Sequence, residues 1–297
     1  MIARACLLAL LLTGSSVGGF AAGRWSIQDS PRLEEGLLTE ASGLACSQRV
    51  EGAVWSINDS GGGAALFLFD LTSGRQLGSV SLAGVKNRDW ESLDSFVLDG
   101  EPWLLIADTG DNRSRRETCT LLLVKEPRFS VVKDGREVRP DRQITFRFDN
   151  GPRDCEAVAA DPDQGRVLLL SKRTWPPVAY ELPLTPADGA VAVAQRLGPV
   201  NLPKAAPWEG PYASQNTGLA IRSDGKMAAV LTYGRVFLFP RWEGQSWGEA
   251  FAAKPQRLPR HGLAQAEGIC FSKDGRSLLV VSEGRGAPVV RYGIEER

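Results

Sequence analysis

The chain has 297 residues, of which 43% are hydrophobic and 24% charged, and its 35 Lys and Arg balance its 35 Asp and Glu. A formal net charge of zero argues against a nucleic-acid binder that depends on bulk positive charge. The single histidine, His261, argues against chemistry that needs a histidine pair or a histidine-rich metal site.

Residues 1–22 are expected to be a signal peptide. Arg4 precedes an apolar run over 5–12, and small residues around Phe20 offer a cleavage point. The run is too short to span a bilayer, and no cysteine follows it at a lipobox position. We therefore expect an exported protein, periplasmic or secreted, with one domain over 23–297 and no membrane span in its mature form. An uncleaved anchor helix is the alternative.

The rest of the chain reads as all-β, with short apolar runs separated by Gly, Asp and Pro. Five segments open with a polar residue, then a small residue and an aliphatic one; the leading residues are Ser42, Glu91, Glu156, Thr217 and Glu267. A second apolar run ends 16 or 17 residues later in every case, at Asp59, Asp108, Lys172, Tyr233 and Glu283. This spacing predicts a repeated β-meander of about 50 residues, the size of a propeller blade.

The repeats predict a five-bladed β-propeller. The last repeat leaves room for only three strands before Arg297, so the segment 25–38 is expected to supply the fourth strand and close the ring. Six blades, with one hidden between Glu91 and Glu156, and an irregular β-sandwich are the alternatives.

The first strand of each blade lines the central channel, so the leading residues are expected to face one another. Three carboxylates in a narrow channel repel unless a cation or protons offset their charge. Oxygen ligands without His or Cys favour a hard cation, and Ca²⁺ accepts six to eight oxygens in loose geometry. The sequence thus predicts a calcium site made by Ser42, Glu91, Glu156, Thr217 and Glu267. Glutamates paired with arginines or bridged by water are the alternative.

The strand ends and the loops after them are expected on the same face as these leading residues. Arg88, Arg113, Lys172 and Arg173 would form a basic rim able to hold a phosphate group. Asp59, with Asp108 in reserve, would orient or deprotonate the attacking water. A solvated loop is the alternative for the arginines of 113–116. Four aromatic residues would stack on a base or sugar, or else pack between blades: Trp175, Trp208, Tyr212 and Tyr233.

Four cysteines follow the signal segment. Cys46 and Cys270 stand in apolar runs and are expected to be buried as small hydrophobic residues. Cys119 and Cys155 are the one pair considered for a disulfide, which an oxidising compartment would permit.

The leading-residue series, at its intervals, resembles the calcium-activated nucleotidases, or apyrases, which carry channel calcium on a Ser, Glu, Glu, Ser, Glu series. The segment 55–62 resembles the loop that holds an active-site aspartate in that family, and Asp59 matches that aspartate. Asn58 and Ser60 depart from that loop, and Asp108 begins a segment, 108–112, that differs more. The segments 89–91 and 108–113 also resemble exported bacterial propellers of the phytase-like and SdiA-regulated groups. These resemblances imply a propeller that carries calcium in its channel.

Two functions follow as hypotheses. The first is a calcium-dependent hydrolase of phosphate esters or anhydrides, acting on a small phosphorylated molecule. The second is a non-catalytic propeller that binds a ligand or protein on the same face, with a structural calcium. A polysaccharide-binding or adhesin role is a weaker third. The sequence predicts neither the substrate nor the oligomeric state.

Overall fold

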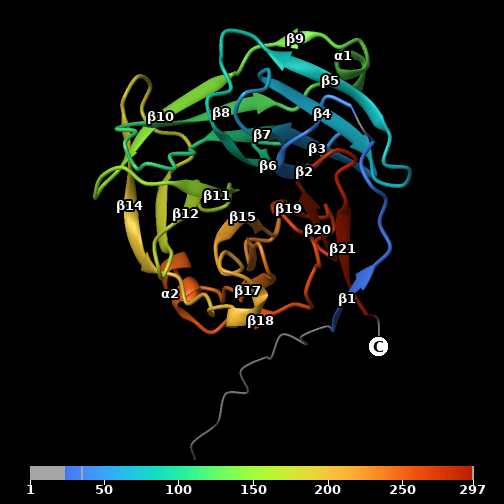
Figure 1. Cartoon of the computed structure of the whole chain (residues 1–297). Helices are drawn as coiled ribbons and strands as arrows, with labels where there is room; N and C mark the ends of the chain where they lie inside the picture. The colour runs from blue at the N-terminus through green and yellow to red at the C-terminus, as the bar shows by residue number, and fades with distance from the viewer. Residues whose placement is uncertain (1–23, 35, 296–297) are drawn as a thin grey trace, which may run out of the picture.

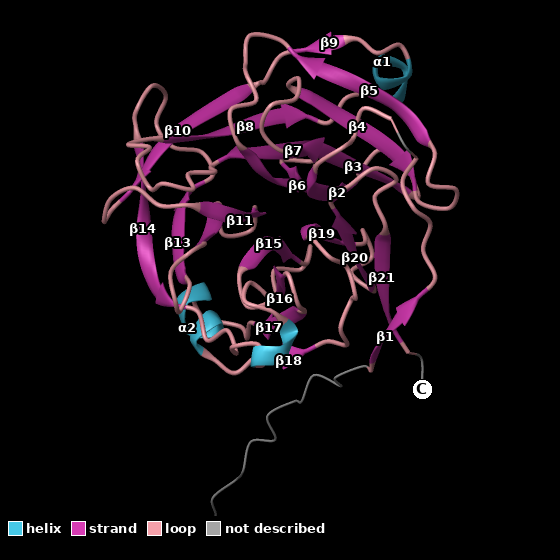
Figure 2. Cartoon of the chain, in the orientation of Figure 1, coloured by secondary structure: helices cyan, strands magenta, loops and turns pink. Residues whose placement is uncertain are grey.

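The computed structural model describes residues 24–34 and 36–295, so the expected signal peptide lies outside the described residues. The described chain is nearly all β, and its strands surround a central axis (Figures 1 and 2). None of its helices is long and apolar enough to cross a membrane.

Hydrogen bonding divides the strands into four sheets. The first contains β2 (Ala41–Cys46), β3 (Ala53–Asn58), β4 (Ala65–Asp70), β5 (Gln76–Leu82) and the short edge strand β9 (Glu137–Val138). The third contains β15 (Asn216–Ile221), β16 (Met227–Thr232), β17 (Val236–Pro240) and β18 (Gln256–Arg257). The last contains β19 (Ala266–Phe271), β20 (Ser277–Ser282), β21 (Val289–Ile294) and β1 (Trp25–Gln28).

The second sheet has eight strands because two antiparallel meanders share an edge. One consists of β6 (Trp90–Leu98), β7 (Glu101–Asp108), β8 (Cys119–Lys125) and β10 (Arg142–Phe148). The other consists of β11 (Cys155–Asp161), β12 (Arg166–Ser171), β13 (Val178–Pro183) and β14 (Ala192–Pro199). Their outer strands β10 and β14 pair in parallel over three residues.

The helices are short and peripheral. They are α1 (Phe129–Lys133), α2 (Trp247–Ala252) and the 3₁₀ turn η1 (Pro207–Glu209). The long stretch between Glu91 and Glu156 supplies β6, β7, β8 and β10, and it extends through α1 and β9 to the edge of the first sheet. No additional meander lies in that stretch of the described chain.

The innermost strands β2, β6, β11, β15 and β19 follow one another around the axis, and β19 lies beside β2 (Figure 1). This radial order of antiparallel sheets is that of a β-propeller. The expected closure by the N-terminal segment is confirmed, because β1 pairs antiparallel with β21, from Trp25 opposite Ile294 to Gln28 opposite Arg291.

The core is divided among the spaces between neighbouring meanders. Trp55 and Trp90 are buried together between the β2–β5 and β6–β10 meanders. Phe148 of β10 packs edge-on against Tyr180 of β13, with ring centroids 4.9 Å apart. Burial of side chains of this size stabilises such contacts by about 1.5–3 kcal/mol each. Apolar packing therefore holds the meanders side by side.

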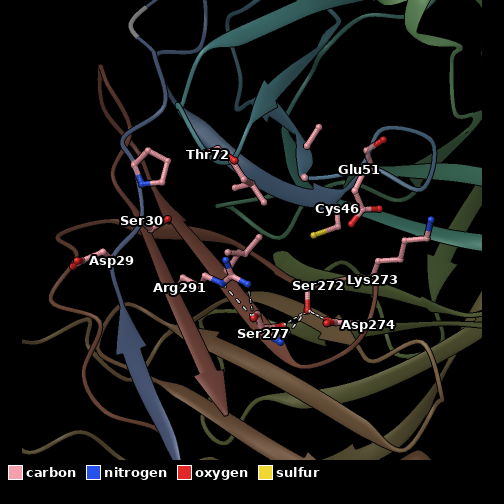
Figure 3. A pocket seen from close by; sticks show the side chains of 16 residues that line it. Asp29, Ser30, Cys46, Glu51, Thr72, Ser272, Lys273, Asp274, Ser277 and Arg291 are labelled. Atoms are coloured by element: carbon pink, nitrogen blue, oxygen red, sulfur yellow. Dashed lines mark hydrogen bonds between the residues drawn. The ribbon is translucent and has the colours of Figure 1, made fainter. Parts of the chain in front are cut away.

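All four described cysteines are buried free thiols. The disulfide considered for Cys119 and Cys155 is not present, and both residues pack in the apolar cluster of the eight-stranded sheet. Cys46 and Cys270 are buried as expected. Cys46 also faces a cavity of about 770 Å³ located where β2 and β19 end (Figure 3).

Candidate functional site

Each predicted leading residue occupies an irregular position in its strand pair. The register between the first and second strands of each meander shifts at Ser42, Glu91, Glu156, Thr217 and Glu267. Such a bulge leaves one residue outside the regular ladder and changes the direction of its side chain. The repeat detected in the sequence therefore corresponds to a repeated bulge at one end of the innermost strands.

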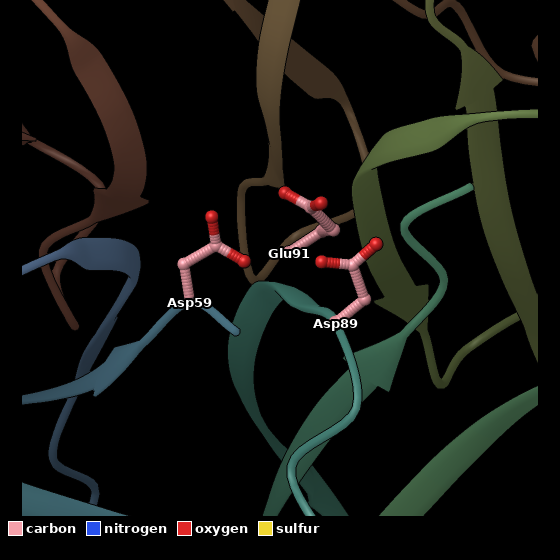
Figure 4. A group of neighbouring side chains, drawn as sticks. All are labelled: Asp59, Asp89 and Glu91. Carbon is pink, nitrogen blue, oxygen red and sulfur yellow. The ribbon is translucent and has the colours of Figure 1, made fainter. Parts of the chain in front are cut away.

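Acidic side chains gather at this end of the axis in two overlapping groups. Carboxylate oxygens of Asp59, Asp89 and Glu91 lie within 4.8 Å of one another, and Figure 4 shows the three side chains converging. A second group with the same spacing joins Glu91 to Asp154 and Glu156. Glu91 belongs to both groups and is buried, so it is the centre of the acidic cluster.

The backbone of Gly110 approaches this cluster closely. A Cβ atom at Gly110 would collide with Oε1 of Glu91 and with the carboxylate of Asp89. The Gly110 N–H also donates to the backbone oxygen of Asp89, at 3.2 Å. Any side chain at this position would displace the two carboxylates.

Burial and mutual repulsion favour the neutral form of these acids. Burial raises the pKa of Glu91 well above its ordinary value, and the charges of Glu156, Asp59 and Asp89 add to the effect. Burial, reinforced by Asp59, raises the pKa of Asp89 to about 6. The pKa of Glu283, beside the cluster, rises to about 7 because of burial and the charges of Glu267 and Asp59. The cluster therefore carries more carboxylates than its surroundings neutralise.

Lys172 enters this cluster from the end of β12. Its ammonium group is buried and forms an ion pair with Glu156. It also donates to the hydroxyl of Tyr233, at 3.2 Å, which in turn donates to Oε1 of Glu267, at 2.6 Å. Burial lowers the pKa of Lys172, but Glu156 and Glu267 raise it by more, so the group stays charged. Glu156 and Glu267 are thus partly satisfied by protein groups, whereas the carboxylate of Glu91 has no hydrogen bond or ion pair with a described residue.

The hydroxyls of Ser42 and Thr217 connect neighbouring innermost strands. Ser42 Oγ donates to the backbone oxygen of Trp90, at 2.6 Å, and Thr217 Oγ1 donates to that of Ala266, at 2.6 Å. Trp90 and Ala266 immediately precede Glu91 and Glu267. Each hydroxyl therefore fixes the backbone that carries the next glutamate.

The two candidate bases have different surroundings. Asp108 is buried and paired with Arg116, whose Nη2 lies 2.7 Å from Asp108 Oδ1. Arg116 also donates to the backbone oxygen of Gly110, so this pair supports the Gly110 loop. Asp59 is half-buried, belongs to the acidic cluster, and has no ion pair with any described residue.

The basic side chains predicted for phosphate also separate. Arg88 and Arg113 are exposed on loops. Arg173 pairs with Asp154, with Nε 2.6 Å from Oδ2, and also donates to Asn112. Lys172 is not on the rim but inside the acidic cluster.

A cavity of about 670 Å³ opens beside the cluster, with Lys172, Arg173 and Tyr233 in its wall. Tyr212 also lines it and is 63% exposed, and nearby in the chain Trp208 is 85% exposed, so neither packs between meanders. Trp175 is 41% exposed, with the ammonium of Lys204 5.5 Å from its ring centroid. Of the four predicted aromatics, only Tyr233 is tied into the cluster.

Asp89, Asp154 and Gly110 were not among the predicted site residues. The sequence does contain a signal for the two aspartates, since each stands two positions before a leading glutamate, in Asp89-Trp90-Glu91 and Asp154-Cys155-Glu156. Gly110 carries no comparable signal, because its role depends on a close approach between a loop and another strand.

No protein-family model and no curated protein matches the chain. Solved structures with partial likeness include hydrazine synthase of Kuenenia stuttgartiensis, with a TM-score of 0.44 and 12% identity over 86% of this chain and 72% of that one. A chain of a nidogen/laminin complex has a TM-score of 0.46 and 15% identity over 82% and 73%. The WD40 repeats of RRP9 have a TM-score of 0.40 and 12% identity over 86% and 67%. The assignment of the fold rests on the chain's own sheets, and that of the site on its own residues.

Proposed function

We propose that this protein is an exported five-bladed propeller that binds Ca²⁺ at the acidic end of its channel. The observation that carries the proposal is the convergence of Asp59, Asp89 and Glu91, whose carboxylate oxygens lie within 4.8 Å of one another. Oxygen donors alone, with net negative charge, suit a hard divalent cation. Asp154 and Glu156 would complete the acidic surroundings on the other side of Glu91.

The count of five blades follows from dividing the eight-stranded sheet at its single parallel contact. Each half is then an antiparallel meander of four strands, like the other sheets. β9 is an addition to the edge of the first blade, and β1 completes the last one.

The proposed ligand set differs from the five leading residues. Glu91 and Glu156 stay in it, and Asp59, Asp89 and Asp154 join them. Ser42 and Thr217 would position the glutamates through their backbone bonds. Glu267 would lie at the edge of the site, where it accepts from the Tyr233 hydroxyl that Lys172 also contacts.

The fuller hypothesis is calcium-dependent hydrolysis of a phosphate ester or anhydride. The cation would neutralise charge on the phosphate. Asp59 would orient the attacking water, since it is half-buried and free of ion pairs with described residues, whereas Asp108 is paired with Arg116. Arg88 and Arg113, exposed on loops, would bind the anionic ligand.

A non-catalytic binding role is the second candidate. It is favoured by the exposed Tyr212 in the wall of the 670 Å³ cavity and by the exposed Trp208 nearby in the chain, because large exposed aromatic side chains are common in ligand and protein recognition. In this reading the calcium stabilises the face that presents them.

Two measurements test the proposal. Calorimetric titration of the purified protein with CaCl₂, after chelator treatment, should detect a bound ion, and MgCl₂ should bind more weakly. A panel of nucleotides, sugar phosphates and aryl phosphates should then be assayed with calcium and with chelator. Calcium-dependent turnover supports the hydrolase, calcium binding without turnover supports the binding role, and absence of calcium binding overturns both.

A further inference from the structure

The thiols of Cys46 and Cys270 lie against each other where the first and last meanders meet. Cys46 is the last residue of β2, and Cys270 is the penultimate residue of β19. Their Sγ atoms are 3.6 Å apart, and both residues are buried. A disulfide needs the sulfurs about 1.5 Å closer than this.

We propose that Cys46 and Cys270 form a disulfide that links the first innermost strand of the ring to the last one. The two residues are 224 positions apart in the chain. Besides side-chain packing, this seam contains the β1–β21 pairing, the isolated Arg32–Pro288 bridge and a hydrogen bond from Lys273 Nζ to the backbone oxygen of Gln48, at 3.1 Å. A covalent link between residues so distant in sequence strongly restricts the unfolded chain and so favours the closed ring.

An oxidant can reach this pair from outside. Cys46 lines the 770 Å³ cavity, where Figure 3 shows its sulfur beside the open space. Cys270 lines a second cavity of about 340 Å³, and Ser272 and Lys273 line both. A small disulfide-bearing oxidant therefore has its widest approach to Cys46.

The chemistry is a thiol–disulfide exchange in two steps. Cys46 loses its proton, and its thiolate attacks one sulfur of the oxidant, forming a mixed disulfide and releasing one thiol. Cys270 then loses its proton and attacks Sγ of Cys46, which forms the protein disulfide and releases the second thiol. The protein gives up two protons and two electrons, and the oxidant's disulfide takes up both. Burial raises the pKa of Cys270 and so disfavours its thiolate, and the second step is favoured instead by the short distance of 3.6 Å between the two sulfurs.

The test starts from fully reduced protein kept folded and incubated with hydroxyethyl disulfide. Peptide mapping under non-reducing conditions should find Cys46 joined to Cys270. The Tm should rise by about 5–15 °C and return on reduction. Cys270→Ser should stop at a mixed disulfide on Cys46, whereas Cys119→Ser, the matched control, should keep both the link and the rise in Tm.

Three results would overturn the proposal. One is a folded protein whose Cys46 and Cys270 stay reduced under conditions in which the denatured chain is oxidised. Another is a bridge between Cys119 and Cys155 in place of the proposed one. The third is a Cys46–Cys270 link that leaves the Tm unchanged, since the linked seam would then add nothing to the closed ring.

Discussion

Replacing Glu91 by glutamine should stabilise the calcium-free protein and abolish its response to calcium. Glu91 is the residue shared by both acidic groups, and burial together with Glu156, Asp59 and Asp89 raises its pKa. Glutamine has nearly the same shape but carries no charge, so it relieves repulsion in the absence of a cation and removes a ligand in its presence. A glutamate with a purely structural role would behave in the opposite way.

The magnitude follows from the spacing of the carboxylates. Two unit charges 4.8 Å apart repel by about 3.5 kcal/mol at an effective dielectric constant of 20. Partial protonation reduces this value, so the calcium-free variant should gain about 1–3 kcal/mol, or about 2–10 °C in Tm. Calcium at 100 times its Kd should stabilise the wild-type protein by about 2.7 kcal/mol, or about 5–10 °C, and the variant by almost nothing.

Differential scanning calorimetry in chelator, followed by titration with CaCl₂, measures both effects. Glu126→Gln is the matched control, because Glu126 is equally buried but accepts from Ser47 Oγ, Gln48 N and Trp55 Nε1 beyond the far end of β2. The amide would face a donor there, so that variant should lose about 1–3 kcal/mol and keep its calcium response. If Glu91→Gln lowers the Tm in chelator and keeps the calcium shift, the metal-site reasoning is refuted.

Three further predictions concern the same face and the opposite end of the strands. Gly110→Ala should weaken calcium binding at least tenfold by calorimetry, because the added Cβ would displace two carboxylates. Gly63→Ala is the control and should keep the affinity, since a Cβ there meets no atom within 4 Å. Equal calcium affinities of the two variants would contradict the site geometry. Asp59→Asn, assayed at saturating calcium, should lower any phosphate hydrolysis by about 10²–10⁴-fold, and an active variant would exclude Asp59 from that role. Burial raises the pKa of Asp94 to about 7, although backbone hydrogen bonds act to lower it. Asp94 therefore binds a proton on folding at intermediate pH, and its contribution to the free energy of unfolding falls as the pH rises from about 4 to about 7. Denaturant titrations in chelator should show that the free energy of unfolding of Asp94→Asn increases relative to the wild type between pH 5 and pH 8. An equal difference at both pH values would contradict the raised pKa of Asp94.

The repeat could be predicted from the amino-acid sequence alone. A polar residue followed by a small and an aliphatic one, and a second apolar run ending 16 or 17 residues later, located the innermost strands and, to within one residue, the ends of the second strands near Asp59 and Asp108. These features are local, because strand alternation and turn residues depend on neighbours within one meander. The closure by the N-terminal strand also followed from counting strands, since an incomplete last repeat leaves an exposed edge.

Which side chains meet depends on how the meanders pack in three dimensions. It directed Lys172 to Glu156, brought Asp89 and Asp154 to Glu91, and placed Gly110 against both Glu91 and Asp89. The spacing of repeats along a chain fixes neither the distance between loops of different blades nor the direction of their side chains. Cys46 and Cys270 show this most clearly: each reads as an ordinary buried residue in its own strand, and their contact exists only because the ring brings the two ends of the chain together.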